Sequence, residues 1–181
     1  TSTEIQAITP SALAGMTADQ VDGLSTAQTV ALTGLQVAGL TTTQLAALTT
    51  TQLAALTTTQ IQAIETADVA ALTTSQIVAL TTAQAAALQA GQLAQLTSTQ
   101  LNKFDSADLQ ALTTAAIAGL TSVQLNDLNT TQLTTLTTLQ IQGLGTSGIS
   151  ALNSTQIANL TSTQLNSLTS TQVMKLTIDQ V

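Results

Sequence analysis

One eight-residue unit of this sequence is Leu48-Thr49-Thr50-Thr51-Gln52-Leu53-Ala54-Ala55. We number its positions from one, at Leu48, to eight, at Ala55. The first position recurs 22 times between residues 8 and 176, and it is apolar every time. Leu occupies 18 of these places, so the first position is predicted to belong to the core of the fold.

The sixth position follows the same rule. It recurs 23 times, from Ile5 to Val181, and is Ile, Leu or Val everywhere except at Thr29 and Ala85. No insertion or deletion interrupts the register. A frame kept this strictly is typical of arrays in which each unit stacks on its neighbours. We therefore predict a single uninterrupted octad array over residues 1–181, compatible with a segment of a longer chain.

The second and fifth positions carry the signals of a helix start. From Thr9 onward the second position is Thr, Ser, Asp or Asn in 19 of 22 copies, and these are the residue types that cap helix N-termini. The fifth position is Gln in 17 of 23 copies, at the spacing that completes a capping box. The apolar residues at positions one and six have the spacing of a hydrophobic staple around that start. Each octad is thus predicted to begin its own helix.

The rare residue types agree with this frame. Pro10 follows Thr9 at the third position, the first residue of the predicted helix, where proline is favoured. Lys103 and Lys175 both lie at the eighth position, where a cation in the last turn would complement the helix dipole.

A period of eight does not suit one long helix. Because eight residues overshoot two helical turns by roughly 80°, an apolar stripe would wind around the rod. Helices this short are unstable alone, so they must be held by packing between repeats. We predict an all-α solenoid or superhelix of very short α-helices, one per octad, with Leu, Ile and Val inside and Thr, Gln and Ala outside.

The alternative fold is a β-solenoid with 16-residue coils. Thr, Ile and Val favour strands. Positions one and six are five residues apart, however, so in one straight strand they would face opposite sides. Recurrent Ala and Gln are also poor strand formers.

The composition excludes most catalytic and ligand-binding chemistry. The chain has no His and no Cys, so it lacks an imidazole base, a thiolate and the usual ligands of zinc. Two Lys, no Arg and a net charge of −7 argue against nucleic-acid binding. No apolar run is long enough for a membrane span. We expect no enzyme activity, no catalytic residues, no cofactor, no metal and no membrane insertion.

Two acidic quartets are the most tempting candidate sites. Glu65 with Asp68, and Asp105 with Asp108, are carboxylate pairs three residues apart that suggest Ca²⁺ binding or acid–base chemistry. Both pairs also occupy the second and fifth positions, so the preferred interpretation is a variant of the capping box. Phe104, at a first position, is predicted to replace Leu in the core.

A glycine cluster interrupts the consensus. Gly143, Gly145 and Gly148 suggest a phosphate-binding loop, but the Lys and the preceding strand of such loops are missing. We predict instead an irregular joint near residues 143–148.

The repeat resembles the Leu-Thr-Thr-x-Gln-Ile/Leu-x-Ala octad tracts of large bacterial surface or secreted proteins, as residues 72–80 and 80–88 illustrate. That resemblance implies an extracellular or cell-surface, non-enzymatic structural or adhesive segment. It transfers no functional residues.

Two features suggest self-association. The sequence starts at a second position, Thr1, and stops at a sixth, Val181, so the contact that joins internal repeats is expected to join copies end to end. Charged residues make up only 6%, which leaves little repulsion between copies. We expect a stalk or a self-assembling filament whose partner is the chain itself. The alternative is a lattice of Thr side chains that binds ice or, as an adhesin, a surface or glycan.

Overall fold

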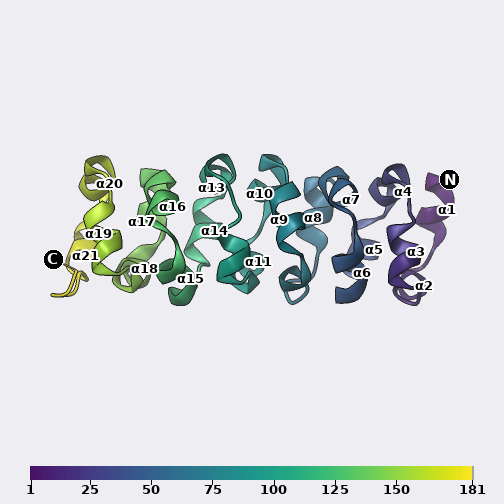
Figure 1. Cartoon of the computed structure of the whole chain (residues 1–181), viewed down its shortest axis with the longest axis horizontal. Helices are drawn as coiled ribbons and strands as arrows, with labels where there is room; N and C mark the ends of the chain where they lie inside the picture. Colours follow the sequence, from purple (N-terminus) through teal and green to yellow (C-terminus); the bar gives the residue numbers. More distant parts are fainter. Residues whose placement is uncertain (181) are drawn as a thin grey trace. The chain divides into compact units, whose positions relative to one another are not determined.

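The computed structural model describes residues 1–180, and Val181, the last of the predicted sixth positions, lies outside them. The described residues form 21 α-helices and one 3-10 helix, and they contain no strand (Figure 1). The helices have from four to seven residues. Each octad contributes one of them, except those that start at Ile64 and Leu176. The all-α prediction is confirmed, and the β-solenoid alternative is not supported.

The chain divides into two units, Thr1–Ala87 and Leu88–Val181, which are described separately. The helices of the first unit are α1 (Ser2–Ala7), α2 (Pro10–Ala14), α3 (Ala18–Asp22), α4 (Thr26–Ala31), α5 (Gly34–Ala38), α6 (Thr42–Ala47), α7 (Thr50–Ala55), α8 (Thr58–Ala63), the 3-10 helix η1 (Val69–Ala71), α9 (Thr74–Ala79) and α10 (Thr82–Ala87). Those of the second are α11 (Ala90–Gln95), α12 (Ser98–Leu101), α13 (Ser106–Ala111), α14 (Thr114–Ala118), α15 (Ser122–Asp127), α16 (Thr130–Thr135), α17 (Thr138–Gly143), α18 (Gly145–Ala151), α19 (Ser154–Asn159), α20 (Ser162–Ser167) and α21 (Ser170–Val173).

The helix starts have the predicted caps. At α7 the hydroxyl of Thr49 accepts a hydrogen bond of 3.1 Å from the backbone N–H of Gln52. The side-chain oxygen of Gln52 accepts one of 2.7 Å from the backbone N–H of Thr49. Pro10 is the first residue of α2, directly after its N-cap Thr9. These reciprocal bonds satisfy backbone donors that a two-turn helix would otherwise leave unpaired.

Most of the described helices end at the next first position, and six of them end one or two residues earlier. Leu56, after α7, has φ −58° and ψ 142°, and Thr57 then has φ −69° and ψ 159°. These two extended residues turn the chain into the next helix. The prediction for the lysines was wrong: α12 ends at Leu101 and α21 at Val173, so Lys103 and Lys175 follow their helices instead of lying in the last turn.

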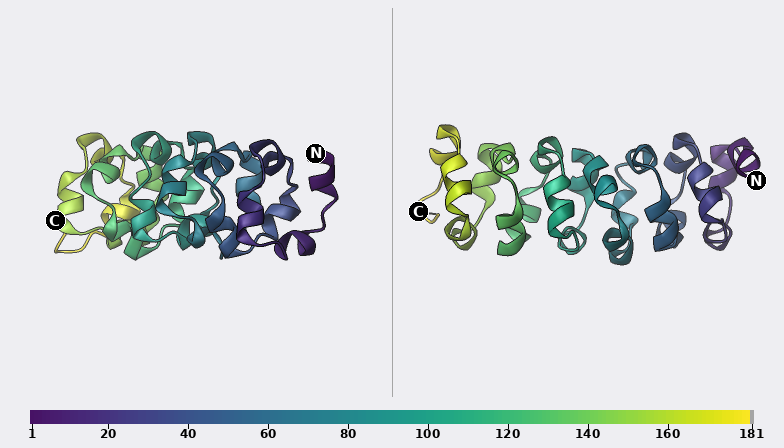
Figure 2. Two further views of the ribbon diagram at one scale, coloured as in Figure 1. Left: turned by 45° about the vertical axis from the view of Figure 1, so that its right-hand side comes forward. Right: turned by 90° about the horizontal axis from the view of Figure 1, so that it is seen from above.

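Within each unit a helix packs on the element three octads further along the chain. In the first unit the pairs are α1–α4, α2–α5, α3–α6, α4–α7, α5–α8, α6–η1, α7–α9 and α8–α10. In the second they are α11–α14, α12–α15, α13–α16, α14–α17, α15–α18, α16–α19, α17–α20 and α18–α21. Figure 2 shows these short helices following the coil of each unit from two further directions. Each unit therefore winds as a solenoid, and neighbouring turns within it pack on each other.

The core consists of positions one and six, as predicted. Leu53 is 0% exposed and Leu56 4% exposed. Phe104 is buried in place of Leu, which agrees with its predicted role. Small residues at position eight allow helices to approach closely: a Cβ on Gly119, which follows α14, would lie 2.7 Å from the Cβ of Ala90 in α11.

The predicted placement of Gln on the outside was wrong. From Gln36 onward, every Gln at the fifth position within the described residues is buried, at 8% exposure or less. A buried amide needs hydrogen-bond partners for its oxygen and for its nitrogen. The capping box uses only the oxygen, so a second set of contacts must hold the nitrogen.

Candidate functional site: the glutamine ladder and the hollow at Gly148

The buried glutamines join successive turns of the coil. The amide nitrogen of Gln52 donates to the backbone carbonyl oxygens of Asp22, at 2.8 Å, and Leu24, at 2.7 Å. These acceptors lie at the end of α3 and in the corner that follows it. One Gln side chain thus closes the N-terminus of its own helix and the C-terminus of a helix in the preceding turn.

The same contact recurs through both units. Each of the following glutamines donates to the carbonyl oxygen 31 residues earlier: Gln36, Gln44, Gln52, Gln60, Gln76, Gln84, Gln124, Gln132, Gln140, Gln156, Gln164, Gln172 and Gln180. All except Gln132 and Gln172 also donate to the carbonyl oxygen 28 residues earlier. We call this set the glutamine ladder. The acceptors thus lie between three and a half and almost four octads earlier in the chain.

The first turn shows what buries the glutamines. Gln20 caps α3 in the usual way, because its oxygen accepts from the backbone N–H of Thr17 at 2.8 Å. No preceding turn covers it in the structure, and its side chain is exposed. Gln28, also in the first turn, is only half-buried. The capping box therefore does not require burial, and the inter-turn contact produces it.

An amide suits this position for a chemical reason. Its oxygen accepts from the cap while its nitrogen donates to carbonyls. An ionised Glu would complete the capping box equally well, but it has no donor for the carbonyls of the previous turn. The ladder thus holds the coil together and offers no group for acid–base chemistry.

The two acidic quartets differ in structure. Asp105 is the N-cap of α13, and its carboxylate accepts from the backbone N–H of Asp108 at 2.8 Å, so the capping interpretation holds for that contact. At Glu65 the capping interpretation was wrong. Residues 66–68 form a turn followed by η1, whose N-cap Asp68 makes no side-chain cap hydrogen bond. Glu is a poor N-cap residue, and Asp is shorter than the Gln it replaces, which explains the loss of the box.

Two further observations concern the acidic groups. The N-terminal ammonium donates a hydrogen bond to Glu4 and attracts its charge, and both effects lower the pKa of that carboxyl. Among residues 1–180, no three acidic side chains lie close enough to hold a metal ion.

The glycine cluster changes one corner of the coil. Leu144, at a first position, has φ −58° and ψ −22°, which is helical, whereas Leu56 at the same position of its octad has ψ 142°. Gly145 follows with φ +65°, a conformation that L-residues rarely adopt. Gly148 stands at the fifth position in place of Gln. No phosphate-binding strand–loop–helix is present within the described residues.

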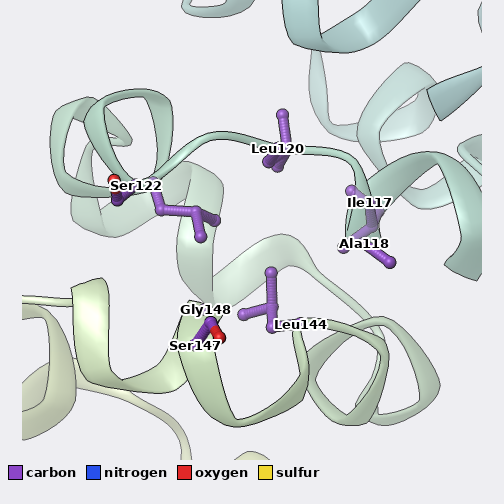
Figure 3. A pocket seen from close by; sticks show the side chains of 8 residues that line it. Ile117, Ala118, Leu120, Ser122, Leu144, Ser147 and Gly148 are labelled. Carbon is purple, nitrogen blue, oxygen red and sulfur yellow. The ribbon is translucent and has the colours of Figure 1, made fainter. Parts of the chain in front are cut away.

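A hollow of about 170 Å³ lies where the side chain of a Gln at position 148 would be (Figure 3). Its lining consists of Ile117, Ala118, Leu120, Ser122, Leu125, Leu144, Ser147 and Gly148. The glutamine rule, 31, 30 and 28 residues earlier, applied to position 148 gives the first three of these residues. The hollow therefore lies at the place where the glutamine ladder lacks one Gln side chain.

A second, wider groove of about 520 Å³ lies beside the start of α13. It is lined mainly by polar residues, including Asn102, Asp105, Ser106 and Asn129. The glutamine ladder is weaker here. The amide nitrogen of Gln132 donates to the carbonyl oxygen of Leu101, at 3.2 Å, but not to the carbonyl oxygen 28 residues earlier. Sequence reasoning identified Asp105 but gave no sign of the groove.

Comparison with known proteins places this architecture in a family. The sequence profile of the ALTTAQ repeat matches residues 35–63, 61–98 and 101–138, more than half of the chain. The chain belongs to the ALTTAQ repeat family. No curated protein and no solved structure matches it significantly.

The structure gives each position of the ALTTAQ repeat a role. Residues 79–84 spell it in full. Leu80 is a core residue, and Thr81 caps α10 by accepting from the backbone N–H of Gln84 at 3.3 Å. Gln84 donates to Leu53 at 2.8 Å and to Leu56 at 2.7 Å. The ALTTAQ repeat thus contains one capped helix start and the Gln side chain that bonds this helix to the preceding turn.

None of the helices that the structure describes in this ALTTAQ array has the length and apolar character needed to cross a membrane.

Proposed function

We propose that this ALTTAQ array is a non-enzymatic structural element, a stalk or self-assembling extracellular filament in which copies stack end to end. The ladder is the observation that supports this proposal most strongly. One contact, repeated in most octads, joins successive turns within each unit. It makes no distinction between a next turn in the same chain and a next turn in another copy.

Within residues 1–181, the first turn exposes groups that the inter-turn contact covers in later turns. Ile8, Met16 and Leu24 occupy first positions and are half-buried, whereas Leu32 and Leu40 in the next turn are each 4% exposed. The amide oxygens of Gln20 and Gln28 cap the starts of α3 and α4, but no preceding turn within residues 1–180 covers these side chains. This turn therefore presents apolar side chains and amide donors.

The last turn presents the complementary groups. Leu165 and Val173 occupy sixth positions and are 40% and 50% exposed, whereas Leu133 and Ile141 are 0% exposed. The carbonyl oxygens at these positions are those that a following turn would use as acceptors. A contact between these two faces is heterologous, and heterologous contacts extend without closing.

The charge distribution favours the same outcome. Charged residues make up only 6% of the chain, and at physiological ionic strength the repulsion from its net charge of −7 is screened beyond about 8 Å. Surfaces of Thr, Ala and Asn that carry few charges resist association poorly. The extracellular or cell-surface location is part of the proposal and follows from the resemblance to surface and secreted repeat tracts.

The test is assembly of residues 1–181 at increasing concentration, followed by analytical ultracentrifugation and negative-stain imaging. We expect particles that lengthen with concentration at constant width. The double variant Leu165→Glu with Val173→Glu should prevent growth, because it places charges on the last turn. Leu139→Glu, at a residue 65% exposed within α17, is the matched control and should assemble normally. A discrete monomer at all concentrations, or growth of the double variant, would contradict the proposal.

The Thr-lattice alternative stays a prediction. The hydroxyls of the second-position threonines accept capping hydrogen bonds, as Thr49 and Thr57 do. They are therefore engaged in the fold, and a lattice would have to rely on the third and fourth positions.

A further inference from the structure

We propose that the hollow at Gly148 is a binding site for a primary amide, the functional group of a small carboxamide or of a Gln or Asn side chain. The inference goes beyond the structural role and is independent of it. It rests on what fills the equivalent place in the neighbouring rungs of the ladder.

The neighbouring rungs define the chemistry of the site. Gln140 donates to the carbonyl oxygens of Leu109 at 2.8 Å and of Leu112 at 2.7 Å. Gln156 donates to those of Leu125 and Leu128, both at 2.8 Å. The rung between them lacks its Gln, and the residues that carry the corresponding carbonyls, Ile117, Ala118 and Leu120, line the hollow.

Two of the three carbonyls lack a donor among residues 1–180, whereas that of Ile117 accepts from the backbone N–H of Leu120. The acceptors that a Gln at position 148 would use are the carbonyl oxygens of Ile117, Ala118 and Leu120. In the described part of the chain, the carbonyl oxygens of Ala118 and Leu120 receive no hydrogen bond. A group with two N–H donors fits this pair, as the amide nitrogen does in the other rungs. A carboxylate would be repelled by the same oxygens.

The space matches a small ligand and opens to solvent. The hollow has a volume of about 170 Å³. Ala118, Ser122 and Ser147, which are labelled in Figure 3, line the hollow and are exposed, so a ligand can enter from the surface. Leu125 and Leu144 supply apolar contacts for a short alkyl chain.

The glycines keep the hollow empty of the chain's own side chains. A Cβ on Gly148 would lie 2.8 Å from the Cβ of Leu144, too close for the corner as it stands. The Cβ of Leu144 lies beside Gly148 because the backbone of Leu144 is helical. The turn that follows needs the positive φ of Gly145. The consensus corner returns only if both glycines are replaced.

The experiment uses residues 1–181 labelled with ¹⁵N-glycine, which gives only 9 glycine amides to resolve. Propionamide is titrated into the protein, and the Gly148 signal is assigned by its absence from a Gly148→Ala spectrum. We expect saturable shifts of Gly148, and smaller ones of Gly145, with a dissociation constant on the order of millimolar. Gly15 and Gly23, in the other unit, should not move.

Two comparisons make the result decisive. N,N-dimethylpropionamide has the same carbonyl but no N–H donor, and propionate carries a repelled charge, so neither should shift Gly148 in a saturable way. The variant Gly145→Thr with Gly148→Gln supplies its own amide, and propionamide should no longer bind to the site, read from Gly143. Equal shifts with dimethylpropionamide, or no saturable shift with propionamide, would overturn the proposal.

Discussion

The side-chain amide of Gln140 donates a hydrogen bond of 2.7 Å to the carbonyl oxygen of Leu112, 28 residues earlier. The oxygen of the same amide accepts from the backbone N–H of Thr137 at 2.8 Å. One buried side chain therefore satisfies a donor at the start of α17 and acceptors at the end of α13. Because helices of five or six residues do not persist alone, this double contact is central to the stability of the coil.

Gln140→Ala should destabilise the second unit strongly. The change removes the capping bond and two good inter-turn bonds, at about 0.5–1.5 kcal/mol each, so we expect a loss of roughly 2–4 kcal/mol. Urea denaturation followed by circular dichroism at 222 nm measures it. The control is Gln20→Ala, which removes the capping bond of an exposed Gln and should cost about 1 kcal/mol or less. Equal losses for both variants would mean that the inter-turn bonds add nothing.

Gln140→Glu should make stability depend on pH. Burial and the two facing carbonyl oxygens should raise the pKa of the new carboxyl above its unfolded value of about 4.3. The stability of the variant is then fully present below that unfolded value and is lost as the pH rises through the raised folded pKa. We expect the variant to be roughly 3 kcal/mol less stable at pH 7 than at pH 4, after subtraction of the wild-type profile. A variant whose stability parallels that of the wild type across this range would argue against the contact of this side chain with the carbonyl oxygens of Leu109 and Leu112.

The helix starts of this chain could be predicted from sequence because they are local. Thr49 and Gln52 are three residues apart, and the rules of capping apply within that distance. The number of octads per turn could not be predicted. It depends on contacts between residues that are 28 or 31 positions apart in the sequence, and an eight-residue pattern contains no signal for such a distance.

The second role of the glutamines was missed although the sequence contained a signal for it. Glu completes a capping box as well as Gln does, yet Gln is repeated at 17 of 23 fifth positions. That preference for an amide indicates a donor requirement and hence a partner outside the helix. The capping prediction for Glu65 and Asp68 was wrong for a different reason. Both residues lie at the right positions of the octad, but the lengths of their side chains do not suit a capping box.

Gly145→Ala should destabilise the second unit. At φ +65° an L-residue costs roughly 1–2 kcal/mol, and no neighbouring atom lies within 4 Å to compensate. Gly34→Ala is the matched control. Its Cβ would meet only the Cβ of Ala63, at 3.6 Å, within a helix, so we expect a gain of about 0.5–1 kcal/mol. Thermal unfolding of the two variants separates the signs, and stabilisation by Gly145→Ala would contradict the conformation described.

Deleting one whole octad should leave the fold intact. Removal of residues 48–55 joins two equivalent corners and keeps every later Gln in register with acceptors 28 and 31 residues earlier. Deletion of Thr51 alone shifts everything downstream by one residue and should abolish cooperative unfolding of the first unit. Circular dichroism and urea titration compare the two. A well-folded single-residue deletion would show that the register is not fixed by the ladder.

The distance from the amide nitrogen of Gln140 to the carbonyl oxygens of Leu109 and Leu112 tests the account most directly. A crystal structure of residues 1–181 measures it. We predict one short helix in almost every octad, with that nitrogen within hydrogen-bond distance of both oxygens. Extended coils of 16 residues, or one continuous helix with the Gln140 side chain in solvent, would contradict the account.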